Sequence, residues 1–305
     1  MIDRKKLIEK FLVPLGSKFR IKDHDPGWAG DKDVPVDKRR EIAEEVLTQD
    51  TTELAEAQEL LYADNSWSVL VVFQAMDAAG KDGTIKHVMS GINPQGCQVF
   101  SFKQPSSEEL DHNFLWRCSR CLPERGRIGI FNRSYYEEVL VVKVHPELLV
   151  KQNLPGIEPG DKPPKDFWQH RYEDINAFEK HLARNGTAII KFFLNVSKEE
   201  QAKRFLKRVK EPEKHWKFAA SDLHERKYWD DYMAAYEDCL SATSTEYAPW
   251  YVIPADHKWV TRAAVAAILH QTIRGLDLKW PTVTEADEAV IEQAREQLQA
   301  EKKGK

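Results

Sequence analysis

The chain has 305 residues, of which 42% are hydrophobic and 31% are charged, and its formal net charge is −4. This length can bury one large core with additions, and the balance of residue types is that of an ordinary globular protein. The composition argues against a disordered chain, against a bilayer-spanning one because no apolar run reaches about 20 residues, and against a strongly basic protein that coats nucleic acid. A polyanionic ligand would need a local basic channel.

The cysteines and the first residues indicate the cellular compartment of the protein. Residues 1–6 carry charges but lack the apolar stretch of a secretory signal, so we expect a cytoplasmic protein. Four cysteines are too few for a disulfide framework. Cys118 and Cys121 form a C-x-x-C without a second pair, and we interpret them as structural residues of a helix rather than as a metal or redox site.

Helical and strand patterns alternate along the chain. After a polar N-terminal extension, residues 1–35, apolar residues at helical spacing over 36–62 predict one long helix or two. A further helix is predicted at 111–122. Apolar runs predict five strands, at 69–73, 97–102, 128–132, 188–196 and 250–255. Strands that alternate with helices predict an α/β fold with a doubly wound parallel sheet, in which ligands bind beyond the carboxyl ends of the strands.

The segment between the first strand and the next helix, residues 73–84, has the character of a phosphate-binding loop. Glycine lets the backbone approach a phosphate, the N-terminal amides of the helix supply partial positive charge, and Lys81 adds a full charge. The match to the usual loop is imperfect, because Ala75 stands where the first glycine is expected and the hydroxyl residue is displaced to Thr84. A phosphate site is therefore predicted here, with a plain strand-to-helix turn as the alternative.

The helix predicted after the fourth strand carries a cluster of cations. Ser197 and Glu200 form a capping-box pattern at its start. Arg204 and Arg208 are four residues apart and hence share a face, and Lys210 follows. This helix leaves the sheet at the edge that holds the phosphate loop, which favours a functional role over a solvated charged face.

Helix breakers divide the segment that follows. Pro212 interrupts the basic helix, and Ser221 and Asp222 are predicted to cap the next one. The pattern is typical of a hinged lid, at about residues 200–225, which carries cations over a site of phosphoryl transfer.

Four motifs, in order, resemble the family-2 polyphosphate kinases. They lie at residues 77–84, 131–139, 197–222 and 245–262, and the similarity spans about 35–275. The resemblance implies a P-loop kinase-like five-stranded sheet with a helical lid, as in thymidylate kinases. It also implies Mg²⁺-aided phosphoryl transfer between inorganic polyphosphate and adenine or guanine nucleotides, in homodimers or homotetramers. Residues 36–275 would be the phosphotransferase domain, and residues 276–305 are predicted to form a charged C-terminal helix.

Three matched residues are predicted to be catalytic. Lys81 and the loop amides would hold the transferring phosphates. Asp77 would bind Mg²⁺ and orient the acceptor phosphate, because a carboxylate beside phosphates needs a metal or a proton; a turn-capping aspartate is the alternative. Arg133 suits a bidentate phosphate clamp. Many family members have aspartate at the position of Asn132, whose amide can still accept a hydrogen bond from metal-bound water.

Two further sets complete the predicted site. Phosphate or polyphosphate binding is predicted for Ala78, Ala79, Gly80, Asp82, Gly83, Thr84, Lys103, Arg204, Arg208 and Lys210. Nucleotide binding is predicted for Arg117, Arg120, Asn132, Ser134, Tyr135 and Glu137. Surface salt bridges are the alternative for Lys103 and the arginines that follow it, and a helix-capping carboxylate is the alternative for Glu137.

These motifs predict an enzyme that transfers phosphoryl groups between polyphosphate and AMP or ADP, with no nucleic acid polymer or membrane as partner. The alternative is an ATP-dependent P-loop kinase of a nucleoside monophosphate or another small molecule, but the chain lacks an intact G-x-x-x-x-G-K-[ST] and a Walker B aspartate. A non-catalytic polyanion binder is a third possibility. The retention of Asp77, Lys81 and Arg133 argues against it.

Overall fold

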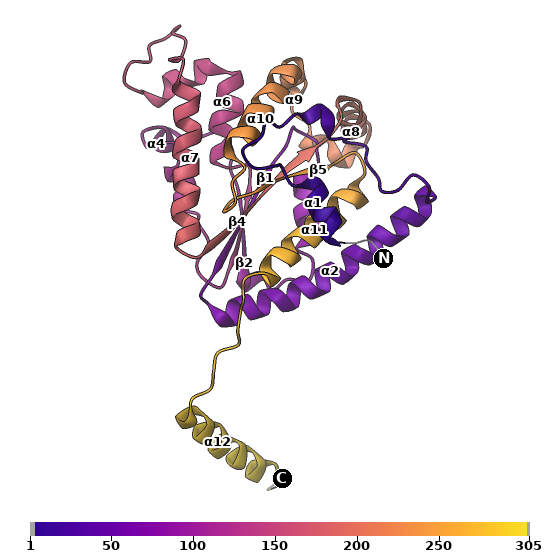
Figure 1. Ribbon diagram of the computed structural model, residues 1–305, viewed down its shortest axis with the longest axis vertical. Helices are drawn as coiled ribbons and strands as arrows, with labels where there is room; N and C mark the ends of the chain where they lie inside the picture. Colours follow the sequence, from indigo (N-terminus) through magenta and orange to yellow (C-terminus); the bar gives the residue numbers. More distant parts are fainter. Residues whose placement is uncertain (1–3, 304–305) are drawn as a thin grey trace.

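A computed structural model describes residues 4–303, and five parallel strands form its centre (Figure 1). The strands lie in the order β2-β3-β1-β4-β5, and their bounds are β1 Ser68–Gln74, β2 Cys97–Ser101, β3 Ile128–Asn132, β4 Thr187–Asn195 and β5 Trp250–Pro254. All residues of β1 are buried, since a parallel sheet is covered on both faces and its strands are continuous apolar runs. The predicted five-stranded parallel sheet is confirmed.

Helices cover the two faces. From β1 the chain crosses toward one edge of the sheet to reach β2, and from β3 it crosses toward the opposite edge to reach β4. Because both crossovers are right-handed, the intervening α3 and α7 lie on opposite faces. On the α3 face, α11 packs against both α2 and α3; on the other face, α7 packs against β4 and α10. The bounds of these helices are α2 Val36–Asp64, α3 Lys81–Val88, α7 Phe167–Arg184, α10 Trp229–Thr243 and α11 Lys258–Arg274.

The remaining elements connect the strands and these helices or lie near the termini. The α-helices are α1 Arg4–Phe11, α4 Ser107–Leu110, α5 Trp116–Ser119, α6 Val141–Val144, α8 Lys198–Lys210, α9 Ala220–Glu225 and α12 Glu285–Lys303. The 3-10 helices are η1 Ile21–Asp23, η2 Pro94–Gly96, η3 Tyr135–Val139, η4 Pro146–Gln152, η5 Pro212–Lys217 and η6 Arg226–Tyr228. None of the helices within residues 4–303 is both long and apolar enough to cross a membrane.

Local capping explains why some of the predicted helix boundaries and caps were wrong. Within the helix predicted at 111–122 only α5, a single turn, is an α-helix: α4, which Ser106 caps with a capping box, ends at Leu110, and Asn113 accepts a hydrogen bond from the Leu115 amide just before α5. Ser221 and Asp222 do not cap α9; its N-cap is Ala219, and both residues lie in the first turn. Ser197 does cap α8, since its hydroxyl accepts from the Glu200 amide at 3.0 Å.

The long helix and the N-terminal segment frame the sheet. The pattern at 36–62 is one continuous helix, α2, which ends where Asn65 adopts a left-handed conformation. The Val13 amide donates to the Trp250 carbonyl at 2.9 Å and Leu12 forms an antiparallel bridge to Tyr251. The N-terminal segment thus covers the free edge of β5, a position that would otherwise offer unpaired backbone groups.

Candidate active site

A cavity of about 650 Å³ lies beyond the carboxyl ends of the strands, where ligands bind in folds of this kind. Its walls come from the loop after β1, the segment between β2 and α5, the elements η3, α6 and η4, and the helices α9 and α10, of which α9 lies in the lid predicted at 200–225. The predicted site residues that line it are Asp77, Lys103, Arg117, Arg133, Ser134, Tyr135 and Glu137. These residues come from the loop after β1, from the segment between β2 and α5, and from the turn after β3 with η3.

The phosphate loop has the backbone expected of an anion site. Ala78 and Gly80 both have positive φ, +61° and +111°, and α3 begins directly after them. A non-glycine residue in the left-handed region is a local strain of the kind that gathers at functional sites. This geometry turns the N-terminal amides of α3 toward the mouth of the loop, where an anion would meet their partial positive charge.

Lys81 lies behind this loop rather than in the cleft. Its side chain is only 9% exposed, and its ammonium donates to the Ala75 carbonyl at 2.9 Å. Burial lowers the pKa of Lys81, and the nearby Arg133 lowers it further, while Asp77 opposes the shift. Burial and Arg133 thus disfavour the charged form of Lys81, and a bound anion would favour it.

Arg133 projects from the turn after β3 into the cleft. Its backbone also has positive φ, +64°, and its guanidinium donates to Asp77 Oδ1 at 2.8 Å. Glu137 Oε2 lies 4.0 Å from the same guanidinium. Burial opposes the charge of Arg133, but Glu137 and Asp77 outweigh it and raise the arginine's pKa. The Asp77–Arg133 pair brings together two residues that are 56 positions apart and that sequence reasoning assigned to catalysis.

Glu137 is held in position by hydrogen bonds that involve Gln74 and Ser134. The Gln74 amide, in the orientation that satisfies both neighbours, donates to Glu137 at 2.9 Å and accepts from the Ser134 hydroxyl at 3.2 Å. Burial raises the pKa of Glu137, although Arg133 and Lys81 counteract this. Glu137 is thus a cleft carboxylate with a fixed position and not a helix cap at the surface.

Asn132 faces the start of α3. Its amide nitrogen donates to Asp82 at 2.7 Å, whereas its Oδ1 atom is buried and has no hydrogen-bond partner within the described chain. A buried acceptor without a donor is costly, so it points to a missing ligand or water. Oxygen atoms of amides and carboxylates are the donor set that Mg²⁺ prefers. The residues at this spot therefore fit a hydrated magnesium ion.

Lys103, Arg117 and Arg120 do not act as one group. Arg117 lies in the cleft wall, where it donates to the Lys103 carbonyl at 2.7 Å and stacks over Phe102. Arg120 is exposed and stacks on Trp116, away from the residues that line the cavity. Because α5 is a single short turn, the three-residue spacing does not place both arginines on the same wall. The structure thus does not bring Arg120 to the predicted nucleotide site.

Two basic residues of α8 contact other segments of the site, Arg204 the phosphate loop and Arg208 the segment 217–222. Arg204 donates to the carbonyls of Ala78, Ala79, Ala255 and Asp256 and to the Glu200 carboxylate, a set that occupies all three of its nitrogen atoms. Arg208 contacts the Lys217 carbonyl and Asp222, and Lys210 is exposed. In this arrangement Arg204 supports the phosphate loop from behind, and its predicted contact with phosphate stays a prediction.

Several cleft residues had escaped sequence reasoning. The helix α9 places Asp222 in the cavity wall, where burial and the charge of Asp77 raise its pKa. His145 and Tyr232 both contact Glu225, at 2.9 Å and 2.7 Å. Tyr236 lines the same wall one helical turn after Tyr232. The spacing of these tyrosines is the one signal that sequence offered, and it is shared with ordinary core residues.

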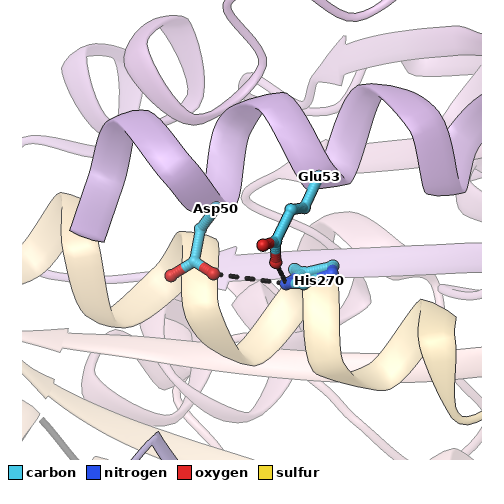
Figure 2. A group of neighbouring side chains, drawn as sticks. All are labelled: Asp50, Glu53 and His270. Atoms are coloured by element: carbon cyan, nitrogen blue, oxygen red, sulfur yellow. Dashed lines mark hydrogen bonds and ion pairs between the residues drawn. The ribbon is translucent and has the colours of Figure 1, made fainter. Parts of the chain in front are cut away.

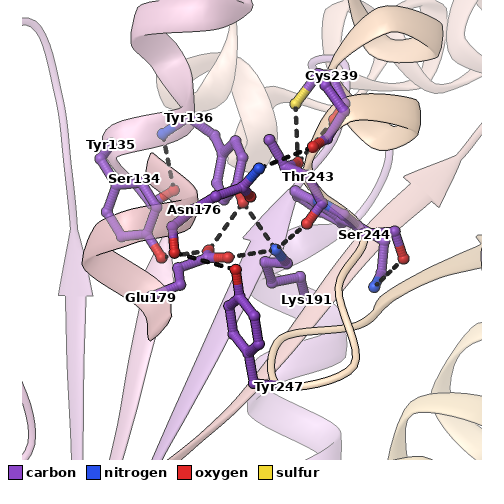
Figure 3. A network of polar contacts seen from close by, with 12 residues as sticks. Ser134, Tyr135, Tyr136, Asn176, Glu179, Lys191, Cys239, Thr243, Ser244 and Tyr247 are labelled. Carbon is purple, nitrogen blue, oxygen red and sulfur yellow. Dashed lines mark hydrogen bonds and ion pairs between the residues drawn. The ribbon is translucent and has the colours of Figure 1, made fainter. Parts of the chain in front are cut away.

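A buried polar network anchors the turn that carries Arg133 (Figure 3). The Lys191 ammonium contacts Glu179 at 2.6 Å, Tyr136 at 2.8 Å and the Thr243 carbonyl at 2.7 Å. Tyr135 and Tyr136 both donate to Glu179 at 2.8 Å. The network joins β4, α7 and α10 to η3, and so fixes the segment that begins just after Arg133 and Ser134. Tyr135 thus lines the cleft, while its hydroxyl donates a hydrogen bond to Glu179 in the core.

A second cluster of titratable side chains lies between α2 and α11 (Figure 2). His270 Nδ1 is 3.2 Å from Asp50 and 3.3 Å from Glu53, and the three ligand atoms lie within 4.8 Å of one another. Arg4 Nη2 lies 2.9 Å from the Asp50 carboxylate, however, and Arg4 Nη1 lies 3.5 Å from Glu53. The guanidinium already supplies the positive charge that a metal would bring, so this group is an ion-pair cluster that fastens α1 to α2 and α11.

A parallel sheet, a phosphate loop at its carboxyl edge and a cleft lined by cations and carboxylates define a P-loop kinase-like phosphotransferase. Over residues 37–281 the sequence matches the profile described as Polyphosphate kinase 2 (PPK2). The chain belongs to the polyphosphate kinase 2 family, and the resemblance described above is confirmed.

Similar proteins align over nearly their whole length. The ADP-polyphosphate phosphotransferase of Rhodopseudomonas palustris is 56% identical over 95% of this chain and 98% of its own. The AMP/ADP-polyphosphate phosphotransferase of Meiothermus ruber is 43% identical, over 93% and 99%. Among solved structures, Polyphosphate Kinase 2 from Arthrobacter aurescens TC1 superposes with a TM-score of 0.82 at 38% identity, over 94% of this chain and 96% of that one. The predicted P-loop kinase-like fold is therefore confirmed.

Proposed function

We propose that this protein transfers phosphoryl groups between inorganic polyphosphate and AMP or ADP. The observation that carries the proposal is the cleft in which the phosphate loop, the Asp77–Arg133 pair and the basic wall at Arg117 meet. The names of the similar proteins support polyphosphate and a nucleotide as the two substrates. Two features argue against the alternative, an ATP-dependent small-molecule kinase. They are the hydroxyl displaced to Thr84 and Asn132 in place of aspartate.

The residues of the cleft would act mainly by position and charge. Phosphoryl transfer has a loose transition state whose negative charge lies on the peripheral oxygens, so fixed cations stabilise it. Arg133 can offer two N–H groups to one phosphate once that phosphate replaces Asp77 as its partner. Lys81 supports the loop from behind with a charge that an anion would stabilise, and burial of the cleft strengthens each of these interactions.

We further propose that the enzyme uses Mg²⁺, held beside the phosphates by Asp77 and, through water, by Asn132. A bound metal would supply positive charge that neutralises phosphate oxygens. Support for this site comes from the Oδ1 atom of Asn132, buried without a donor.

The variant Asn132→Asp tests the metal site without relying on activity. The new carboxylate would lie beside Asp82, where the Asn132 amide now donates at 2.7 Å, so repulsion should destabilise the metal-free protein by about 1–3 kcal/mol. We expect millimolar Mg²⁺ to raise the melting temperature of this variant more than that of the parent. Asn153→Asp, on an exposed loop, is the matched control. Equal magnesium shifts in all three proteins would argue against a metal at Asn132.

The proposed function is tested by an assay free of ATP. Purified protein, Mg²⁺ and long-chain polyphosphate are incubated with either AMP or ADP, and the nucleotides are separated by chromatography over time. We expect ATP from ADP, and ADP followed by ATP from AMP if both acceptors fit. If neither nucleotide is converted while ATP phosphorylates a nucleoside monophosphate, the alternative kinase function replaces the proposal.

Compartment and assembly complete the proposal. We place the enzyme in the cytoplasm, which the four free cysteines support because reducing compartments keep thiols unpaired. Adenine or guanine as the base, and a homodimer or homotetramer as the assembly, stay predictions of the family resemblance.

A further inference from the structure

The C-terminal helix α12 stands apart from the rest of the molecule. Figure 1 shows it away from the sheet and its covering helices, joined to α11 by an extended linker. Every residue of α12 whose side chain is described is exposed. The helix begins at Glu285, beyond the 37–281 segment that matches the family. Neither the cleft nor the family's common fold therefore accounts for it.

One side of α12 is apolar. Val290, Ala294 and Leu298 are spaced four residues apart and share a face, with Ile291 beside them. The three large side chains are 65%, 50% and 65% exposed at Val290, Ile291 and Leu298. An isolated helix of 19 residues is only marginally stable in water, and most helices gain stability by burying an apolar face. Burial of this face against a partner would therefore stabilise the helix.

The charges on α12 make the helix complementary to a second copy of itself in one direction. Residues 285–292 contain four acidic side chains and no basic one, a formal charge of −4. Residues 293–303 contain Arg295, Lys302 and Lys303 against Glu296 and Glu301, a formal charge of +1. Two copies packed in parallel would set one −4 half against the other, whereas an antiparallel pair sets each acidic half against a basic one. Like charges at such a contact are destabilising, so the antiparallel arrangement is favoured.

We propose that α12 joins two copies of this chain by packing antiparallel against its own counterpart. Such a contact is isologous: it closes around a two-fold axis, which would pass near Ala294 and bring Val290 of one copy against Leu298 of the other. A helix of 19 residues is about 28 Å long, so this interface is small and the pairing should depend on protein concentration. The inference does not rest on the proposed catalytic activity.

Cysteine cross-linking tests the pairing and its direction. The full chain is used with Cys97→Ser and Cys121→Ser, which removes the two partly exposed cysteines. Val290→Cys and Leu298→Cys are then oxidised separately and as a mixture. The antiparallel pair predicts that the mixture forms disulfide dimers much faster than either variant alone. Faster cross-linking of each variant with itself would indicate a parallel pair and overturn the proposal.

Two further variants separate a specific contact from chance collision. Ala294→Cys, near the two-fold axis, should cross-link with itself, whereas Glu296→Cys, on the opposite face of α12, should not. Adding Val290→Glu to the Ala294→Cys chain should slow its cross-linking at least about tenfold, because a charge would be buried at the contact. Equal rates for Ala294→Cys and Glu296→Cys would show that α12 does not pair with itself.

Discussion

Replacement of Lys81 by methionine is expected to lower polyphosphate-dependent turnover about 10²–10³-fold while leaving the fold intact. The ammonium donates to the Ala75 carbonyl within the phosphate loop and is almost fully buried. Because burial lowers its pKa, the charged form is held against an energetic cost that methionine, of similar length, does not carry. The kcat of the variant and its free energy of unfolding in urea, measured together, check both parts of the expectation.

The matched control is Lys86→Met, which removes an exposed lysine from the same helix. This variant should keep normal turnover, since the Lys86 side chain is exposed, whereas that of Lys81 is buried and bonded to the phosphate loop. If Lys81→Met unfolds at much lower urea than the parent, its lost activity would reflect structure, and the role of Lys81 in transition-state stabilisation would lose its support. Activity within about threefold of the parent would contradict that role directly.

The parts of the site that were predictable from sequence lie at the ends of strands. Buried parallel strands read as continuous apolar runs, so their carboxyl ends can be located and the residues just beyond them assigned to one edge. Asp77 and Arg133 were placed together in this way, and they form an ion pair at 2.8 Å. The phosphate loop was likewise predictable, because glycine and lysine between a buried strand and a helix are typical of an anion-binding turn.

The parts that were not predictable depend on contacts between distant segments. Arg204 has the same sequence context as a phosphate-binding lid residue, yet its guanidinium turns inward to the carbonyls of the loop. Asp222 enters the cleft only because α9 folds back over the loop. Where local capping competes with periodicity, as at Asn113, the helical pattern was misleading. None of these outcomes leaves a signal within a short window of sequence.

The buried ion pair of Lys191 and Glu179 is the strongest example of a long-range contact that could not be predicted from the sequence. Lys191 lies in the middle of an apolar strand, and both side chains are fully buried. Burial lowers the pKa of Lys191, and Glu179 opposes the shift. The pair gives the two tyrosines of η3 an acceptor in the core, and thereby holds the turn that presents Arg133.

Lys191→Met is expected to destabilise the protein by about 3–5 kcal/mol, because it leaves the Glu179 carboxylate buried without a cation. Urea unfolding of the parent and the variant measures this loss. Turnover should also fall under conditions where the variant is folded, since the turn that carries Arg133 would lose its anchor. Lys180→Met, which removes an exposed lysine from the same helix as Glu179, should change stability by less than about 0.5 kcal/mol.

The double variant Lys191→Met with Glu179→Gln distinguishes loss of charge balance from loss of packing. Glutamine has no charge to leave unpaired, and its carbonyl oxygen can still accept from Tyr135 and Tyr136, as Glu179 does now. We therefore expect the double variant to recover about 2 kcal/mol or more of the stability that Lys191→Met loses. If it is no more stable than the single variant, the role of Lys191 lies in its contact with the Thr243 carbonyl and in filling space, not in balancing the buried carboxylate.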